Sequence, residues 1–155
     1  MSYAATTEVS VEKTRAEIES ILAKYGAAKF AYMTDSDRAV VGFVAHGKAV
    51  KFHLPLPLRT DRSYTHTRHT NKWHQQPLSK EDAYKRWEQG CRSRWRALFL
   101  CVKAKLEAVE CGITTFEQEF LAHFVMPNGQ TFGEYAIPQI EEASRSGKMP
   151  ALLLQ

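Results

Sequence analysis

Hydrophobic residues near the start of the chain follow a helical spacing. Apolar side chains recur every three or four residues between Val11 and Tyr25. Ser10 precedes this stretch as an N-cap candidate, and Gly26 follows it at the position where glycine commonly ends a helix. The pattern predicts an amphipathic helix over about residues 11–25.

From Lys29 onward the spacing of apolar residues changes from helical to alternating. The alternation runs through three stretches, at residues 29–33, 39–45 and 50–54. Polar residues at 34–37 and the pair at 46–47 separate the stretches, and Pro55 ends the last of them. The sequence therefore predicts a three-stranded antiparallel meander with one apolar face.

The longest predicted element is a helix over about residues 80–111. Ser79 stands three residues before Asp82, close to a capping box, and Gly90 is a position at which the helix could kink. At ~100° per residue the apolar side chains form one stripe, which we expect to pack on the meander. This stripe contains Tyr84, Trp87, Cys91, Trp95, Leu98, Val102, Leu106 and Val109.

Two short helices are predicted after Gly112. The first opens at Thr114 or Thr115 and carries Phe116, Phe120 and Leu121. The second covers about residues 133–144 and is expected to bury Tyr135, Ile137 and Ile140. The apolar tail at residues 149–154 is expected to dock on the domain or on a partner. The whole pattern predicts one α+β domain over residues 1–155: an N-terminal helix, the meander, a long helix packed on it, and short C-terminal helices.

Composition and charge narrow the class of protein. Hydrophobic residues make up 44% and charged residues 25% of the 155 residues, which is typical of a globular domain and excludes a disordered chain. No stretch approaches the ~18 apolar residues of a membrane span, and no signal peptide opens the chain. Three cysteines, Cys91, Cys101 and Cys111, are predicted to be buried free thiols of a reducing cytoplasm.

Basic residues gather on one face of the predicted long helix. Lys85, Arg92, Arg96 and Lys103 follow spacings of seven, four and seven, which places them within roughly 20° of a common line. The formal net charge is +4, and a clustered basic excess favours polyanionic partners. Glu88, Glu107 and Glu110 lie near this basic ridge, so an ordinary solvated face is the competing interpretation.

A long polar loop, at about residues 55–78, adds further cations and aromatic rings. It contains no apolar period and is longer than the ~12–15 residues at which loops become functional or disordered. Cations neutralise phosphates and flat rings stack on bases, so these residues have the chemistry of a nucleic-acid surface. The residues concerned are Arg59, Arg62, Tyr64, Arg68, Lys72 and Trp73.

The loop also contains three histidines, His66, His69 and His74. Zinc sites need a fourth ligand or an open water position, and the spacing here matches no zinc signature. A phosphoesterase built on the pair His66-Thr67 would need a second, distant copy of that pair to divide acid and base roles, and the sequence has none. A histidine-dependent hydrolase is kept as a third hypothesis. Nucleophile elbows, phosphate loops and dinucleotide fingerprints are missing, so we expect no catalytic residue, no metal and no cofactor.

Three segments resemble a family of small, mostly uncharacterised proteins encoded by bacteriophages and prophages: residues 11–19, residues 94–98 with 103–110, and residues 112–117. The resemblance covers most of the chain outside the histidine-rich loop. It implies a phage or prophage product acting in the cytoplasm of a bacterial host. It implies no particular activity.

The predicted architecture is similar to the core of the Rad52-like single-strand annealing proteins, which phages use for recombination. This is a likeness of fold alone, because no annealing motif matches. The sequence thus favours a non-enzymatic nucleic-acid-binding protein, with single-stranded DNA binding or annealing as the form considered. The alternative is a protein-interaction module, either an inhibitor of a host factor or an assembly component, whose partner is a host protein or a second copy of the chain.

Overall fold

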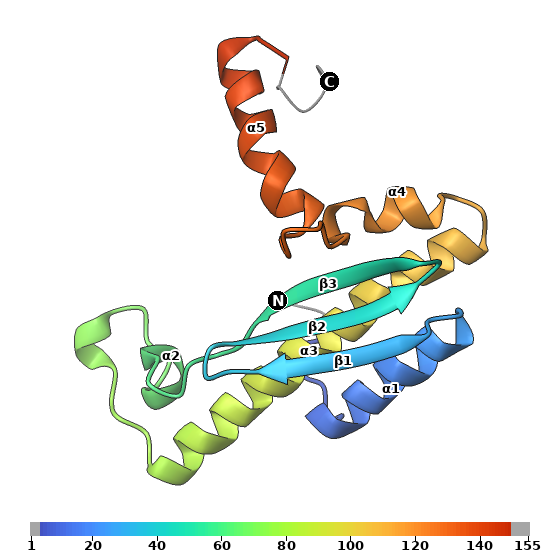
Figure 1. Cartoon of the computed structure of the whole chain (residues 1–155). Helices are drawn as coiled ribbons and strands as arrows, with labels where there is room; N and C mark the ends of the chain where they lie inside the picture. The colour runs from blue at the N-terminus through green and yellow to red at the C-terminus, as the bar shows by residue number, and fades with distance from the viewer. Residues whose placement is uncertain (1–3, 150–155) are drawn as a thin grey trace.

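The computed structural model describes residues 4–149 and confirms the predicted α+β architecture (Figure 1). Helix α1 (Val11–Lys24) is followed by strands β1 (Lys29–Thr34), β2 (Arg38–Ala45) and β3 (Lys48–Pro55). The strands pair antiparallel in the order β1-β2-β3. Ser10 caps α1 through its side chain, and Gly26, at φ +84°, allows the chain to leave the helix at once.

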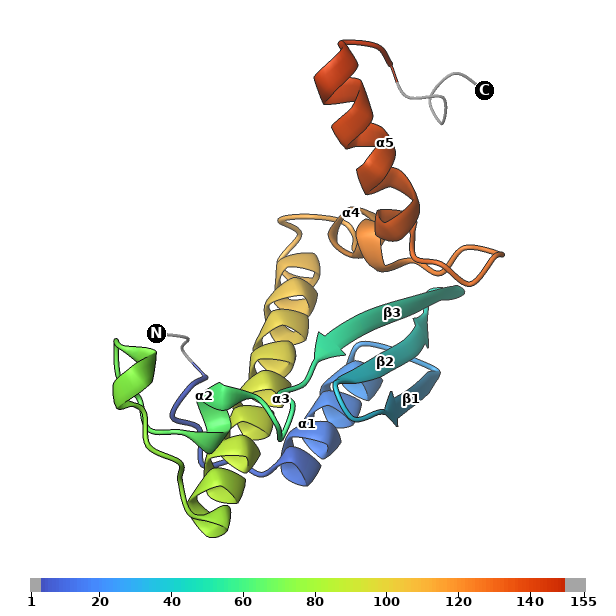
Figure 2. The same ribbon diagram turned by 90° about the vertical axis from the view of Figure 1, so that its left-hand side faces the viewer.

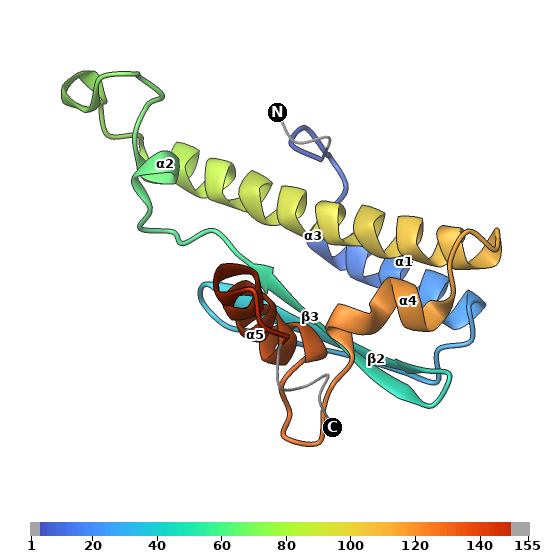
Figure 3. The ribbon, with the colours of Figure 1, turned by 90° about the horizontal axis from the view of Figure 1, so that it is seen from above.

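Helices α1 and α3 (Lys80–Glu110) cover the same face of the sheet (Figures 1 and 3). Alternate residues of β2 and β3 point to this face, and their side chains are buried. They pack against Ile18 and Leu22 of α1 and against Trp95, Val102 and Leu106 of α3. The predicted apolar stripe on the long helix is therefore confirmed in its middle and C-terminal parts.

Helix α3 runs without a break through Gly90, so the kink that this glycine allowed is not formed. The N-terminal part of α3 extends past the sheet (Figure 3). Tyr84, predicted to be core, is therefore exposed, and Trp87 is half-buried. The prediction of three buried thiols is wrong for Cys101 and Cys111, which are exposed; only Cys91 is buried.

After α3, the chain folds back over the end of the sheet through α4 (Phe116–Phe120) and the 3-10 turn η2 (Leu121–His123). Phe120 is fully buried, and its ring meets Phe43 edge to face at 5.8 Å between centroids. Thr115 and Gln118 form a capping box that fixes the start of α4. The predicted short helix is confirmed, except that it ends at Phe120, so Leu121 belongs to η2 instead.

The last helix, α5 (Phe132–Ser146), stands off the body of the protein (Figures 1 and 2). Only its first turn packs on the domain, where Gly133 and Ala136 are buried. The prediction that this helix buries its larger apolar side chains is wrong, because it leaves the sheet after that turn. Tyr135, Ile137 and Ile140 are 41%, 53% and 54% exposed. The sequence also predicts that the tail at residues 149–154 docks on the domain or on a partner. Residues 150–154 of that tail lie outside the described part of the chain.

Gly133 is a packing requirement at the root of α5. A Cβ atom on this residue would lie 2.9 Å from the carbonyl oxygen of Ala122, which is backbone and cannot move aside. We expect Gly133→Ala to destabilise the protein by about 1–3 kcal/mol, measured by urea unfolding. Glu141→Ala, at an exposed position of the same helix, is the control and should change stability by less than about 0.5 kcal/mol. Equal stability of the two variants would contradict this packing.

The segment between β3 and α3 is more structured than the predicted polar loop. It contains the single-turn helix α2 (Arg62–Thr65) and the 3-10 turn η1 (Lys72–His74). An isolated β-bridge pairs His66 with Pro77 and closes the segment into a compact unit. Local hydrogen bonds, rather than burial of apolar side chains, order this segment. Its structure could therefore not be predicted from a periodic spacing of hydrophobic residues. No helix in residues 4–149 combines the length and apolar character needed to cross a bilayer.

Candidate nucleic-acid interface

Three of the four cations on the predicted basic ridge form ion pairs with carboxylates. Lys85 Nζ lies 2.6 Å from Glu81 Oε1, and Arg92 Nη2 lies 2.7 Å from Glu88 Oε2. Arg96 pairs with Glu17 of α1. Lys103 is exposed and has no ion pair within the described residues. The helix is continuous, as predicted, but the ridge is not a row of free charges.

Arg96 ties α3 to α1. Its guanidinium lies 4.3 Å from the centroid of the Phe99 ring, and less than a third of the side chain is exposed. Because reversal would place two carboxylates together at a partly buried helix interface, Arg96→Glu should cost about 2 kcal/mol of folding free energy. Thermal unfolding measures this loss, and the double variant Arg96→Glu/Glu17→Arg should recover most of it. A fully stable Arg96→Glu would show that the pair is not structural.

The basic groove, as we call it, lies between the α2–η1 segment and the N-terminal half of α3. Its volume is about 1200 Å³. Among the described residues, five cationic side chains line it, and Asp82 is the one carboxylate. The cations are Arg62, Arg68, Lys72, Lys85 and Arg86. Figure 3 shows the two walls, with α2 and the chain that follows it lying beside the start of α3.

Hydrogen bonds inside the α2–η1 segment shape the outer wall of the basic groove. Asp61 caps α2 by accepting from the Ser63 backbone N–H at 2.9 Å, and this bond holds the pKa of Asp61 below its usual value. Arg62 Nε donates to Gln75 Oε1 at 2.9 Å, across the segment. The outer wall is therefore held in one shape without a hydrophobic core of its own.

Three contacts fasten this wall to α3. Arg86 Nη1 donates to the His66 carbonyl at 2.6 Å, and Trp87 Nε1 donates to the Pro57 carbonyl at 2.8 Å. The Tyr64 ring lies directly on Gly90, where a Cβ atom would come within 2.8 Å of it. Gly90 thus serves as a docking place for Tyr64 rather than as a kink.

Pairing within the basic groove leaves an excess of positive charge. Asp82 is occupied by the N-cap Ser79, whose hydroxyl donates to Asp82 Oδ2 at 2.6 Å. The pair between Lys85 and Glu81 is exposed on both sides, and such pairs contribute only ~0–1 kcal/mol. A phosphate can therefore recruit Lys85 at little cost. Arg68 and Lys72 are exposed and have no carboxylate partner among the described residues.

The predicted site residues separate into two groups. Arg62, Tyr64, Arg68, Lys72 and Lys85 line the basic groove, and Trp73 sits on η1, 92% exposed. Arg59 lies outside it, with its guanidinium 4.0 Å from the centroid of the Trp87 ring. Arg59 and Arg92 line a second cavity of about 580 Å³ on the α1 side of α3. Arg96 and Lys103 line neither cavity.

Sequence reasoning missed Arg86, which both lines the basic groove and anchors its outer wall. Arg86 is next to Lys85 in sequence and therefore lies ~100° away from it around the helix, off the predicted ridge. Only the folded position of the α2–η1 segment shows that this face of α3 is the relevant one.

The loop histidines do not converge. His66 Nδ1 lies 2.9 Å from its neighbour Thr65 Oγ1. The rings of His69 and His74 are tilted to each other by 51°, with 5.1 Å between their centroids. Within residues 4–149 no three His, Cys, Asp or Glu side chains are placed to hold a metal ion.

Comparison of the chain with protein-family models, with curated proteins and with solved structures finds no match in any of the three.

Proposed function

We propose that this protein binds nucleic acid, with the basic groove as the site of the phosphate backbone. One observation carries the proposal: within residues 4–149, five cations line a groove of about 1200 Å³, and its one carboxylate is already hydrogen-bonded. A polyanion entering the groove would release counterions from itself, which is the main source of affinity in sequence-independent binding.

A single strand suits this surface better than a duplex. Trp73 presents an almost fully exposed ring on the same segment that carries Arg68 and Lys72. Unpaired bases can stack on such a ring, whereas the bases of a duplex are stacked on each other. The proposed setting is a phage or prophage product in the bacterial cytoplasm, where single strands arise during replication and recombination.

The proposal is tested by titrating the protein with labelled single-stranded DNA, duplex DNA and single-stranded RNA of equal length at two salt concentrations. We expect tightest binding to single strands and a strong loss of affinity at the higher salt. Absence of binding to all three ligands at low salt would overturn the proposal and favour the protein-interaction alternative.

Trp73→Ala separates base stacking from phosphate attraction. Stacking contributes ~1–3 kcal/mol per base, so the variant should bind single-stranded DNA roughly 5- to 150-fold more weakly while its salt dependence is unchanged. Ile113→Ala is the matched control, because Ile113 is 80% exposed and lies at the opposite end of α3. Equal affinities of the two variants would remove Trp73 from the site.

A further inference from the structure

The second cavity, on the α1 side of α3, has the size and lining of a site for a small molecule. Its volume is about 580 Å³, and pockets that hold small ligands measure roughly 300–1,000 Å³. Among the described residues, none lines both this cavity and the basic groove. Apolar and aromatic side chains make up much of the wall, and they include Val11, Leu56, Leu58, Trp87, Cys91 and Trp95.

Arg59 presents a fixed guanidinium to the cavity. Its guanidinium carbon lies 4.0 Å from the centroid of the Trp87 ring, and that ring is held in place because Trp87 Nε1 donates to the Pro57 carbonyl at 2.8 Å. Stacking on a ring uses the flat face of a guanidinium and leaves the N–H groups along its edge for hydrogen bonds. Arg59 is exposed and has no ion pair within residues 4–149.

Arg15 presents a second fixed guanidinium, which is half-buried. It lies 4.4 Å from the centroid of the Tyr32 ring and 4.5 Å from that of Trp95. Arg15 Nε is buried without a hydrogen-bond partner, and the side chain forms no ion pair with a described carboxylate. Buried donors normally have an acceptor. The described chain gives this guanidinium none, and a ligand in the cavity is placed to supply one.

The remaining charged groups of the cavity are already engaged. Arg92 Nη2 lies 2.7 Å from Glu88 Oε2, and Asp35 Oδ1 accepts from the Ser36 backbone N–H at 2.7 Å. A hydrogen bond from its own backbone N–H holds the pKa of Glu12, in the first turn of α1, below its usual value. The three carboxylates balance the three arginines of the lining in charge, so the cavity suits a ligand with one negative charge. The two stacked guanidiniums have donors to spare, and the ligand must bring the acceptors.

We infer that the second cavity binds a small aromatic carboxylate. Its ring would lie against the aromatic and aliphatic walls, where flat groups pack well. Its carboxylate would accept hydrogen bonds from Arg15 and Arg59, because the fork of a guanidinium matches the two oxygens of a carboxylate. The inference is independent of nucleic-acid binding, because the cavity and the basic groove have separate linings.

Protection of Cys91 from alkylation tests the site with naphthoate as the probe. Cys91 lines the cavity, and Cys101→Ser/Cys111→Ser leaves it as the one thiol of the chain. Burial raises the pKa of the Cys91 thiol, so the reaction with iodoacetamide is followed at alkaline pH. At a naphthoate concentration ten times its Kd the rate should fall roughly tenfold, because the rate follows the unoccupied fraction. Absence of protection up to the solubility limit of naphthoate would overturn the inference.

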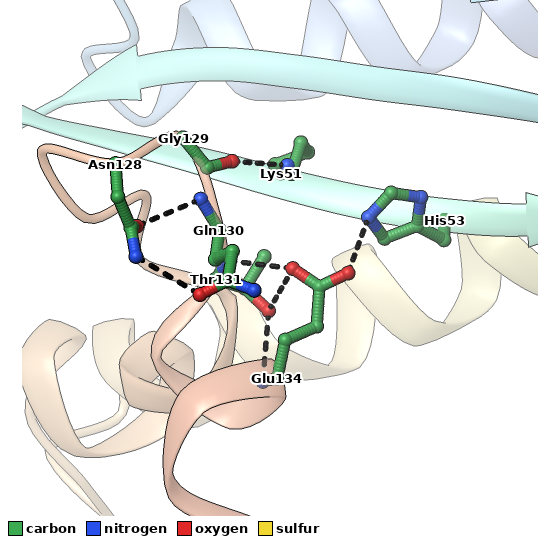
Figure 4. Close-up of polar contacts among 7 residues, drawn as sticks. All are labelled: Lys51, His53, Asn128, Gly129, Gln130, Thr131 and Glu134. Atoms are coloured by element: carbon green, nitrogen blue, oxygen red, sulfur yellow. Dashed lines mark hydrogen bonds and ion pairs between the residues drawn. The ribbon is translucent and has the colours of Figure 1, made fainter.

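Naphthylmethanol, which has the same rings and no charge, tests the role of the arginines. It should bind roughly tenfold more weakly than naphthoate, and Arg59→Gln should weaken naphthoate binding by a similar factor. Lys51→Gln is the control, because Lys51 lies at the root of α5, where its Nζ donates to the Gly129 carbonyl at 2.6 Å (Figure 4). Equal affinity for acid and alcohol, or equal naphthoate affinity of the two variants, would overturn the assignment.

Discussion

Reversing the charge of Arg68 and Lys72 together is expected to weaken single-stranded DNA binding by about 100-fold. Both side chains line the basic groove and have no carboxylate partner among the described residues, so each can meet a phosphate directly. Loss of two charge-assisted contacts accounts for about 3 kcal/mol, which is a hundredfold in affinity. Fluorescence anisotropy with a labelled oligonucleotide measures the change.

The control for this variant has the same net charge. Lys13→Glu/Lys148→Glu reverses two exposed cations on α1 and beyond α5, outside the basic groove. If DNA binding depends on the cations of the basic groove, the control variant should bind single-stranded DNA with an affinity within a factor of a few of the wild type. If DNA binding depends on the total charge of the protein alone, the two double variants should lose affinity equally, and the groove would have no special role.

Trp95→Ala is expected to cost about 3–5 kcal/mol of folding free energy. The Trp95 side chain is 1% exposed, and it lies between the Tyr32 ring, at 5.9 Å between centroids, and the Arg15 guanidinium, at 4.5 Å. Truncation would leave a large cavity at the junction of α1, α3 and the sheet. Because domains of this size have only ~5–15 kcal/mol of stability, the variant should unfold at markedly lower urea concentration.

The same substitution at Trp73 provides the contrast. Trp73 is 92% exposed, so Trp73→Ala should leave the urea midpoint nearly unchanged while it weakens binding. Two tryptophans in one chain are thus expected to separate stability from function. A large loss of stability on replacing Trp73, or a small one on replacing Trp95, would contradict the burial on which this account depends.

The fold was largely predictable because its elements carry strong local signals. The switch from helical to alternating spacing at Lys29 and the cap at Ser79 define elements whose apolar faces must meet. The prediction of burial is wrong for α5, whose amphipathic pattern does not lead to burial of its larger apolar side chains. Periodicity shows that a helix has an apolar face; it does not show whether that face is covered by its own chain.

The types of residue in the candidate site could be predicted from the sequence, but which of those residues lie together could not. The continuous helix that carries Lys85, Arg92 and Arg96 is confirmed, but Lys85 lines the basic groove while Arg92 lines the second cavity. It could not show that Glu17 of a distant helix would pair with Arg96, since that contact depends on tertiary packing. The basic groove likewise arises from a segment ordered by side-chain hydrogen bonds, which leave no hydrophobic period in the sequence.

The salt dependence of binding to an oligothymidylate tests the central claim most directly. If the five cations of the basic groove each meet a phosphate, the logarithm of the affinity should fall with the logarithm of salt concentration at a slope of about −3.5. Arg68→Glu/Lys72→Glu should reduce the size of that slope by about 1.4. A slope near zero, or one that this variant leaves unchanged, would contradict phosphate binding in the basic groove.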